Sequence, residues 1–416
     1  MKWAIVALAA VGAIITVDGC GSSSGQTLAA TRIRGRTLTI YASAPLRGPS
    51  TVSGQAVING AQLALEQLHS RVGEYRIALK VLDDATVAQG GWDPGQTTIN
   101  VRLAVLDPTT IGYIGDFNSG ASAISIPPLN RAGIPQVSPT SAAVGLTSAA
   151  LGAQPGEPQK YYPTGIRTFA RVVPNDRIQA IAQVRVQQEM GCASTFVLND
   201  GEVDGSDAAR SFEVAAEAAH LHLAGVGTFV RQATSYKALA AGIAHLAPDC
   251  VMIAADTESG AALLTTDLAA AMPTVKIFGT AGLAESTFAN PSQGGIPLSV
   301  DPRVVLTSPA LGLNEYPPSA RVFNTAYTRR FGPPQPDAIF GYEAMSLMLD
   351  AINRATVAGT EAAVRSEVRK AIFATRDRDS VLGKYSINRN GDTTLQRYGV
   401  WGIVRGHLTF WEAIDA

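Results

Sequence analysis

The stretch Ile111-Gly112-Tyr113-Ile114-Gly115-Asp116-Phe117-Asn118-Ser119-Gly120-Ala121-Ser122 joins a short apolar run to polar residues that can cap a helix. A β-branched and aromatic run of this length predicts a buried strand, and the Asn and Ser residues that follow predict a helix N-terminus. Strand, loop and helix in this order form the repeating unit of α/β folds with parallel sheets. The stretch therefore predicts a helix that begins at the carboxyl end of a parallel strand.

The same unit repeats along the chain in two blocks. In the first block we expect strands at 37–42, 77–82, 111–115 and 134–137, with helices at 54–70, 94–106 and 120–132. A polar stretch with Gly and Pro at 149–162 interrupts the rhythm. The second block has expected strands at 195–198, 225–230, 251–255 and 275–278, with helices at 177–190, 207–220, 236–246 and 259–271. Two similar blocks in series predict a two-lobed α/β protein.

The last part of the chain, residues 303–416, does not repeat this pattern. It contains one expected strand, helices at 318–331, 337–356 and 361–374, and two terminal strands. These elements are too few and too mixed to form a third domain. We therefore expect them to complete both lobes by crossing between them.

Composition and charge exclude some classes of protein. The chain has 46% hydrophobic residues, 16% charged residues and a formal net charge of −1. Lys and Arg are scattered without a basic run, which argues against a nucleic-acid partner. Beyond the N-terminus no stretch of 18 or so apolar residues is present, so no membrane-spanning helix is expected there.

The N-terminus has the features of an export signal. Lys2 precedes an apolar run from Trp3 to Val17, which is too short to span a bilayer and ends at Gly19-Cys20. This resembles the bacterial lipoprotein signal, in which cleavage leaves a lipid-modified cysteine at the mature N-terminus. There are two alternatives: the segment is an ordinary signal peptide that has a cysteine by chance, or it is a short buried helix. The flexible Gly21-Ser22-Ser23-Ser24-Gly25-Gln26 segment favours lipidation at Cys20 and a location outside the cytoplasm.

Four passages carry a resemblance that covers nearly the whole mature chain. They are Leu46-Arg47-Gly48-Pro49 with Gly54 and with Asn59-Gly60-Ala61 through Leu65-Glu66; Ile114 to Gly120 with Leu129 to Pro135 and Ser138-Pro139; Phe340-Gly341-Tyr342-Glu343-Ala344; and Gly383-Lys384-Tyr385-Ser386-Ile387 with Asn390-Gly391-Asp392. Their order and spacing resemble the bacterial branched-chain amino-acid binding proteins, the substrate receptors of ABC importers with the type I periplasmic-binding fold.

The resemblance implies two doubly wound parallel-sheet lobes joined by three crossing strands, with ligand held between the lobes. The crossings are expected near 171–174, 306–311 and 379–383. The resulting organisation is a signal peptide at 1–19, a lipidated Cys and flexible tether at 20–35, an N-terminal lobe at 36–172 plus 312–378, and a C-terminal lobe at 173–311 plus 379–416.

The expected binding residues follow the carboxyl ends of strands, where ligands of doubly wound sheets sit. Ser119 and Thr140 can cap helices there and leave backbone N–H groups open to an anion, although plain capping is the alternative role. The resemblance adds positions in the second lobe. The expected ligand-binding set is Ser53, Asn118, Ser119, Gly120, Thr140, Ser141, Asp204, Asp256, Glu258 and Thr280.

Charge placement divides the roles of the two lobes. Loops at Ser119 and Thr140 suit an anionic or carbonyl group, whereas Asp204 with Asp256 or Glu258 suits an ammonium group. A Tyr-Gly pair of the family is replaced here by Asp204-Gly205, which favours a cationic or strongly hydrogen-bonding ligand over a simple leucine-type one. We expect the ligand to bridge the lobes and to favour the closed form.

A disulfide is expected between Cys192 and Cys250. Each cysteine stands just before an expected strand, and these strands are the first and third of the second lobe. In the usual strand order of such a lobe they lie side by side with their starts at one edge. Two buried thiols are the alternative, and an extracytoplasmic location favours the disulfide.

The function expected from these features is solute binding without catalysis, cofactor or metal. No Gly-x-Ser-x-Gly elbow between a strand and a helix, phosphate loop or His-Glu-x-x-His motif is present. Asp83-Asp84 and Asp200-Gly201-Glu202 could form an acid and base pair of a hydrolytic enzyme, but solvated turn acids explain them more simply. We expect a monomeric lipoprotein that delivers an amino acid or related compound to an ABC permease. A ligand sensor of the same fold, without transport, is the main alternative.

Overall fold

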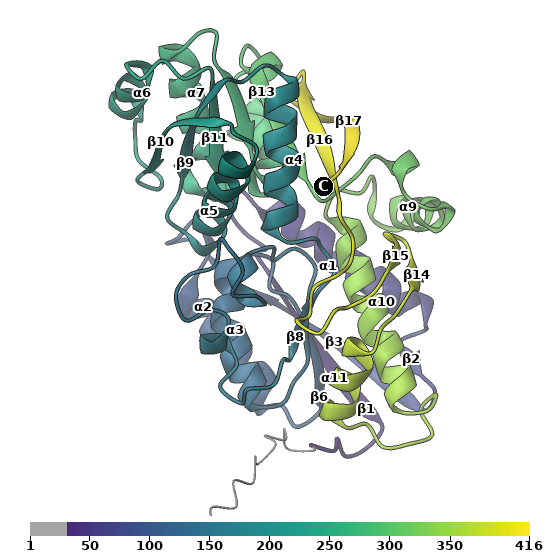
Figure 1. The fold of residues 1–416 in the computed structure, drawn as a ribbon. Helices are drawn as coiled ribbons and strands as arrows, with labels where there is room; N and C mark the ends of the chain where they lie inside the picture. The colour runs from purple at the N-terminus through teal and green to yellow at the C-terminus, as the bar shows by residue number, and fades with distance from the viewer. Residues whose placement is uncertain (1–30) are drawn as a thin grey trace, which may run out of the picture.

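The structure, a computed structural model, describes residues 31–416 and consists of two α/β lobes, each built on its own mainly parallel sheet (Figure 1). The expected fold class is thus confirmed. The expected signal peptide and Cys20 lie outside the described residues.

The first lobe has a six-stranded sheet with helices on both faces. In spatial order its strands are β2 (Arg71–Val72), β3 (Tyr75–Asp83), β1 (Thr37–Ala44), β6 (Thr110–Ile114), β7 (Gln136–Ser138) and β8 (Phe169–Arg171). All neighbours except β2 and β3 pair in parallel. Its helices are α1 (Thr51–Gln67), α2 (Pro94–Leu106), α3 (Ser119–Arg131), α9 (Pro318–Phe331), α10 (Ala338–Ala355) and α11 (Arg365–Phe373).

The second lobe has a seven-stranded sheet. In spatial order its strands are β10 (His222–Thr228), β9 (Ser194–Asn199), β11 (Cys250–Ala254), β12 (Lys276–Gly279), β13 (Val304–Ser308), β16 (Arg397–Val404) and β17 (His407–Asp415), of which the last two are antiparallel additions. Its helices are α4 (Asp176–Glu189), α5 (Val203–Ala218), α6 (Lys237–Ala244), α7 (Ala261–Ala271) and α8 (Ser286–Ala289). Two small hairpins, β4 (Ala85–Thr86) with β5 (Gly91–Trp92) and β14 (Arg378–Ser380) with β15 (Gly383–Tyr385), lie outside both sheets.

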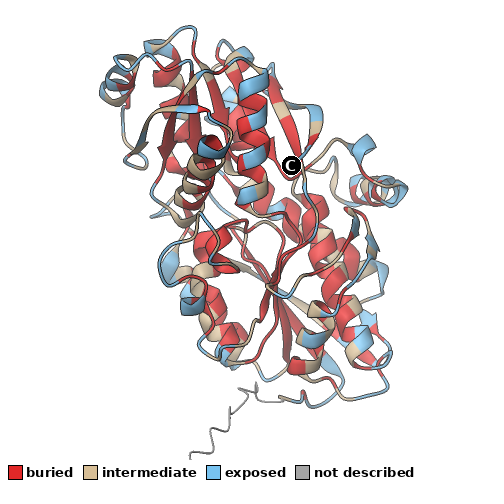
Figure 2. Ribbon diagram, viewed as in Figure 1, coloured by how far each residue is buried: buried red, intermediate tan, exposed pale blue. Residues whose placement is uncertain are grey.

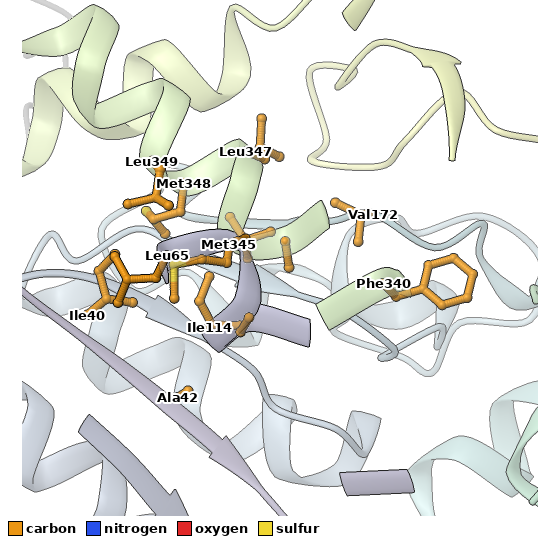
Figure 3. Packing of buried hydrophobic residues seen from close by; sticks show 14 of the residues in the cluster. Ile40, Ala42, Leu65, Ile114, Val172, Phe340, Met345, Leu347, Met348 and Leu349 are labelled. Carbon is orange, nitrogen blue, oxygen red and sulfur yellow. The ribbon is translucent and has the colours of Figure 1, made fainter. Parts of the chain in front are cut away.

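Burial explains why the strands appear as nearly continuous apolar runs. Strands β6, β8, β11 and β13 are buried along their whole length, because helices cover both faces of each sheet (Figure 2). In the first lobe Ile40 and Leu65 pack with Met345 and Met348 of α10 (Figure 3). Tyr41 faces the other side of the same sheet and packs with Leu129 of α3.

Two glycines allow α1 and α10 to pack closely. A Cβ on Gly60 would lie 2.1 Å from the carbonyl oxygen of Ala338, and a Cβ on Gly341 would lie 2.1 Å from that of Val57. Both distances are far below van der Waals contact, so any side chain at either position would push the helices apart. This accounts physically for the glycines in two of the four passages that carry the family resemblance.

The chain crosses between the lobes three times. The first crossing follows β8 and ends at α4, and the second follows β13 and ends at α9, close to the expected places. The third differs from expectation. Val381, Leu382, Tyr385 and Ile387 belong to the core of the first lobe, so the crossing falls between Ile387 and β16 rather than at 379–383. Residues 379–387 therefore belong to the first lobe, and their expected place in the second lobe is wrong.

The first lobe also begins earlier than expected. Arg32 pairs with Val364, and Ile33 donates its backbone N–H to Ala363 and is buried in the core. The expected tether at 20–35 is therefore wrong for its last residues, because an apolar residue at position 33 packs against the segment that leads into α11.

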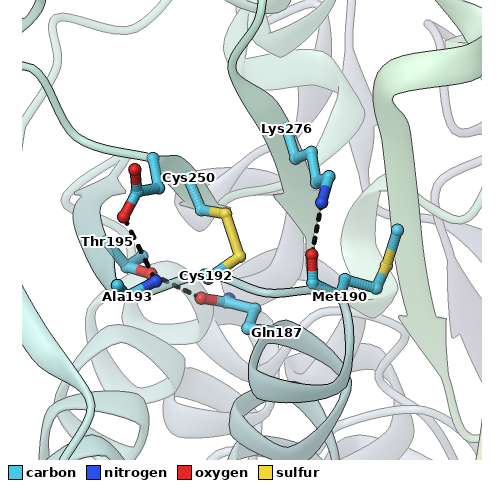
Figure 4. Close-up of a disulfide and its surroundings, with 8 residues drawn as sticks. Gln187, Met190, Cys192, Ala193, Thr195, Cys250 and Lys276 are labelled. Carbon is cyan, nitrogen blue, oxygen red and sulfur yellow. Dashed lines mark hydrogen bonds between the residues drawn. A yellow bond between two sulfur atoms is a disulfide. The ribbon is translucent and has the colours of Figure 1, made fainter.

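Cys192 and Cys250 are joined by a disulfide, with their Cα atoms 5.8 Å apart (Figure 4). Cys250 starts β11 and Cys192 lies just before β9, and the register pairs Cys250 with Thr195. The two strands are adjacent and parallel, so their starts meet at one edge of the sheet.

Candidate functional site

A cavity of about 60 Å³ lies between the lobes, where the carboxyl ends of several strands meet. This is several times the space of about 10–15 Å³ that one water needs, so the cavity suits a small molecule. Its walls come from both lobes. They are formed by Phe117, Asn118, Thr140, Ala142, Asp176, Gln179, Asp204, Gly205, Ala208, Ala255, Asp256, Thr280, Ala281, Gly282, Glu285, Pro309 and Asp337.

Two larger hollows on the surface are less suited to enclose a ligand. One, of about 520 Å³, is bounded by α1, α10 and the segment around Arg71, all in the first lobe. The other, of about 480 Å³, lies by the second crossing and has largely apolar walls, including Tyr316, Phe323 and Trp401. The smaller inter-lobe cavity is our candidate because it lies where the carboxyl ends of strands from both lobes meet.

Hydrogen bonds hold the lobes together beside the cavity. The backbone N–H of Ser119, at the start of α3, donates to Asp204 Oδ2 over 2.7 Å. Asn118 Nδ2 donates to Asp256 Oδ2 over 2.9 Å. In both cases the donor belongs to the first lobe and the carboxylate to the second. The second-lobe acids therefore bind the N-terminus of α3 in the first lobe.

Further contacts between the lobes lie around this centre. Ser50 Oγ donates to Glu258 Oε2 over 2.5 Å and lies 3.1 Å from Glu285 Oε2. On the other side, the backbone N–H of Val144 donates to Asp207 Oδ2 over 2.7 Å. With several points of contact between the lobes, the structure represents a closed arrangement.

The structure places half of the expected binding residues on the cavity wall. Those on the wall are Asn118, Thr140, Asp204, Asp256 and Thr280. Those that do not line it are Ser53, Ser119, Gly120, Ser141 and Glu258. Glu258 contacts the other lobe through Ser50 instead, and the space over Gly120 is filled by the Trp92 ring, 2.5 Å from where a Cβ would lie.

The expected anion-binding role of the first-lobe loops does not fit this arrangement. The Ser119 N–H that could meet a ligand carboxylate already meets Asp204, and Thr140 Oγ1 donates to the carbonyl of Phe117 over 2.6 Å. Ser141 Oγ donates to the carbonyl of Asp116 over 3.0 Å. These donors serve the protein itself, because Asp204 of the second lobe accepts from the Ser119 N–H and backbone carbonyls of the first lobe accept from the two hydroxyls.

Burial shifts the acid–base behaviour of the cavity acids. It raises the pKa of Asp204 to about 7 against the opposing effect of the Ser119 hydrogen bonds, and it alone raises the pKa of Asp337 to about 7. Burial, together with the nearby charge of Glu258, raises the pKa of Glu285 to about 8. The pKa of Asp256 is also raised, first by burial and then by the charge of Asp204. The cavity thus gathers carboxyl groups that ionise reluctantly.

Sequence reasoning missed four polar wall residues: Asp176, Gln179, Glu285 and Asp337. Asp176 is the first residue of α4, and Asp337 immediately precedes α10. Asp176 begins the first helix after a crossing between the lobes, so an acidic residue at that place was the available signal for it, whereas Asp337 lies one helix beyond the second crossing and has no such signal. Glu285 follows a short turn after β12, close to the expected Thr280.

One acid of each pair considered for catalysis, Asp84 and Asp200, is buried rather than solvated, so the expectation of solvated turn acids is wrong for these two; Asp83 and Glu202 are half-buried. Asp84 accepts a hydrogen bond from Ser43 Oγ, and Asp200 accepts one from Ser259 Oγ over 2.5 Å. Both acids therefore stabilise loops at strand ends. Within residues 31–416 no group of three side chains could hold a metal ion.

No helix in the described part of the chain is long and apolar enough to cross a membrane.

Two α/β lobes, three crossings and a cavity walled by both lobes define a bilobal binding protein. A model of the periplasmic binding protein family matches residues 37–404, so the chain belongs to this family. The family resemblance inferred from the four passages is thereby confirmed. A search of curated proteins returned no match.

Solved structures share the fold at low sequence identity. The leucine binding protein LivK of Thermotoga maritima is 21% identical, with a TM-score of 0.77, over 91% of this chain and 99% of that one. The LivJ protein of Streptococcus pneumoniae, in complex with isoleucine, is 17% identical, with a TM-score of 0.71, over 91% and 100%. A solute binding protein of R. palustris, in complex with benzoate, is 18% identical, with a TM-score of 0.72, over 91% and 96%.

Proposed function

We propose that this protein captures a small polar solute, an amino acid or a related compound, between its lobes and delivers it to an ABC importer. The observation that carries the proposal is the inter-lobe cavity, whose walls come from both lobes and whose margins are held by the hydrogen bonds from Asn118 and Ser119. A ligand bound there stabilises the closed form, because only closure brings both walls to it.

The proposal includes a location outside the cytoplasm and a lipid anchor at Cys20, with the protein acting as a monomer. Membership of the periplasmic binding protein family supports the location, and the Cys192–Cys250 disulfide agrees with an oxidising compartment. The protein then stays at the outer face of the membrane, where the permease takes its ligand. With Cys20→Ala, we expect the protein to leave the membrane fraction.

A thermal-shift screen of the lipid-free protein tests the binding function. Amino acids, amides, amines and aromatic acids belong in the panel, the last because a neighbour of this fold holds benzoate. A ligand at 100 times its Kd should stabilise the protein by about 2.7 kcal/mol. If no compound in a broad metabolite panel raised the melting temperature, the binding function would be rejected.

Uptake separates transport from sensing. Cells that carry the gene should accumulate the labelled ligand faster than cells in which it is deleted. Equal uptake, with a bound ligand established by the screen, would favour the sensor.

A further inference from the structure

The walls of the inter-lobe cavity carry acidic side chains without basic ones. Asp176, Asp204, Asp256, Glu285 and Asp337 all line it. Of the residues that form these walls, all within the described part of the chain, none is Lys, Arg or His. Burying carboxylate charge without a partner is costly, so a site of this kind is stabilised by a cation.

An unpartnered acceptor on the wall points to the same kind of ligand. Asn118 is 3% exposed and lines the cavity, and its Nδ2 is committed to Asp256. Its Oδ1 is buried without a hydrogen-bond partner. A buried acceptor left unpaired costs free energy, and an N–H group of a ligand would satisfy it.

The same walls are unsuited to a carboxylate. The Ser119 N–H and the Thr140 hydroxyl could each donate a hydrogen bond to a ligand carboxylate. They already donate to Asp204 and to the Phe117 carbonyl, respectively. A ligand carboxylate would therefore meet five acidic side chains and no basic side chain of the wall.

We propose that the ligand is a small organic amine or guanidine cation that carries no carboxylate, an inference that rests on the proposed binding function. Its N–H groups donate to Asn118 Oδ1 and to the carboxylates of the wall, of which Asp176 belongs to the second lobe and Asp337 to the first. The ligand thus donates hydrogen bonds to both lobes without needing an anionic end.

Matched pairs of compounds that differ by one carboxylate test this proposal. Calorimetric titration compares 3-methylbutylamine with leucine, 1,4-diaminobutane with ornithine, and agmatine with arginine, with benzoate added as an anion. We expect at least one amine to bind tenfold or more tightly than its matched amino acid, and benzoate not to bind.

The outcomes separate this inference from the binding function itself. If leucine, another of the amino acids or benzoate bound at least as tightly as every amine, the binding function would stand and the cation would be rejected. If none of these compounds bound at millimolar concentration, the cation would also be rejected, and the broad thermal-shift screen would then decide the binding function.

Variants locate the bound cation. Asp337→Asn keeps the size of the side chain and removes its charge, so it should weaken binding of the amine by about tenfold or more. Glu189→Gln, at the exposed far end of α4, makes the same change in net charge and should leave Kd within about twofold. Equal Kd values for wild type and for Asp337→Asn and Asp176→Asn, with unchanged melting temperatures, would overturn the assignment of the cation to this cavity.

Discussion

At the scale of single residues, the second-lobe carboxylates contact the first lobe rather than standing free in the cavity. Asp204 and Asp256 each accept a hydrogen bond from the start of α3, and Glu258 accepts one from Ser50. A hydrogen bond to a charged group contributes about 1.5–3 kcal/mol. Such bonds are strong enough to set the balance between the closed and open forms.

Removal of the Asp204 carboxylate should open the lobes. Asp204→Ala leaves the Ser119 N–H without its acceptor, so the closed form loses about 1.5–3 kcal/mol. Small-angle X-ray scattering should then give a larger radius of gyration than for wild type. Glu217→Ala, on the exposed side of the same helix, is the control and should change nothing. An unchanged radius for Asp204→Ala would show that this bond does not hold the lobes closed.

The sequence located some of these residues but not their partners. Asn118, Thr140, Asp204, Asp256 and Thr280 could be assigned to the site because each follows a strand or begins a helix near a strand end. Their hydrogen bonds could not be predicted, because those depend on how far the lobes close. The contact between Ser119 and Asp204 joins residues 85 positions apart, and no local pattern signals it.

At the scale of elements, Arg171 ties the end of β8 to the third crossing. Its side chain is fully buried; Nε donates to Asp392 Oδ1 over 2.8 Å, and Nη1 donates to the carbonyls of Ser141 and Ala143. The element boundaries could largely be predicted from apolar periodicity. The third crossing could not, because its position depends on this ion pair and on Tyr385, whose hydroxyl donates to Glu343.

Loss of the Arg171 charge should destabilise the first lobe strongly. Arg171→Met leaves Asp392 buried without its partner, so we expect a loss of about 3–5 kcal/mol in the free energy of unfolding. Urea denaturation measures it. Arg185→Met breaks an exposed ion pair with Glu189 and should cost under about 1 kcal/mol. Similar costs for the two variants would contradict a structural role for Arg171.

The disulfide should stabilise the second lobe by lowering the conformational entropy of the unfolded chain. Cys192 and Cys250 are 58 residues apart, and the chain-entropy account gives about 4 kcal/mol for a loop of that size. Replacement of both cysteines by Ser should lower the free energy of unfolding by about this amount. In the oxidised protein that carries Cys20→Ala, thiol counting should find no free thiol. Two free thiols would rule the disulfide out.

At the scale of the whole molecule, buried acids gather at the interface of the lobes, all of them from the second lobe except Asp337. Asp176, Asp204, Asp207, Asp256, Glu258, Glu285 and Asp337 surround it, and burial raises the pKa of each. The folded protein therefore holds protons that the unfolded chain releases near its ordinary values of 3.8 for Asp and 4.5 for Glu. The stability that these groups contribute is fully present at pH values below the ordinary pKa values. It is lost as the pH rises through the raised pKa values of the folded protein.

The melting temperature should therefore fall between about pH 5.5 and pH 8.5. The decisive groups are Asp204 and Asp337, with pKa values of about 7, and Glu285, with a value of about 8. Differential scanning calorimetry across this window measures the effect, and Asp337→Asn should make the decline shallower. A melting temperature that rose across the window would contradict the raised pKa values.

The central claim is that a solute binds between the lobes, and hydrogen–deuterium exchange with and without the ligand found in the screen tests it most directly. The account predicts slower exchange in the segments that wall the cavity, namely 117–121, 203–208 and 280–285, in both lobes at once. Protection confined to one lobe, or to α1 and α10 beside the hollow near Arg71, would show that the ligand binds elsewhere.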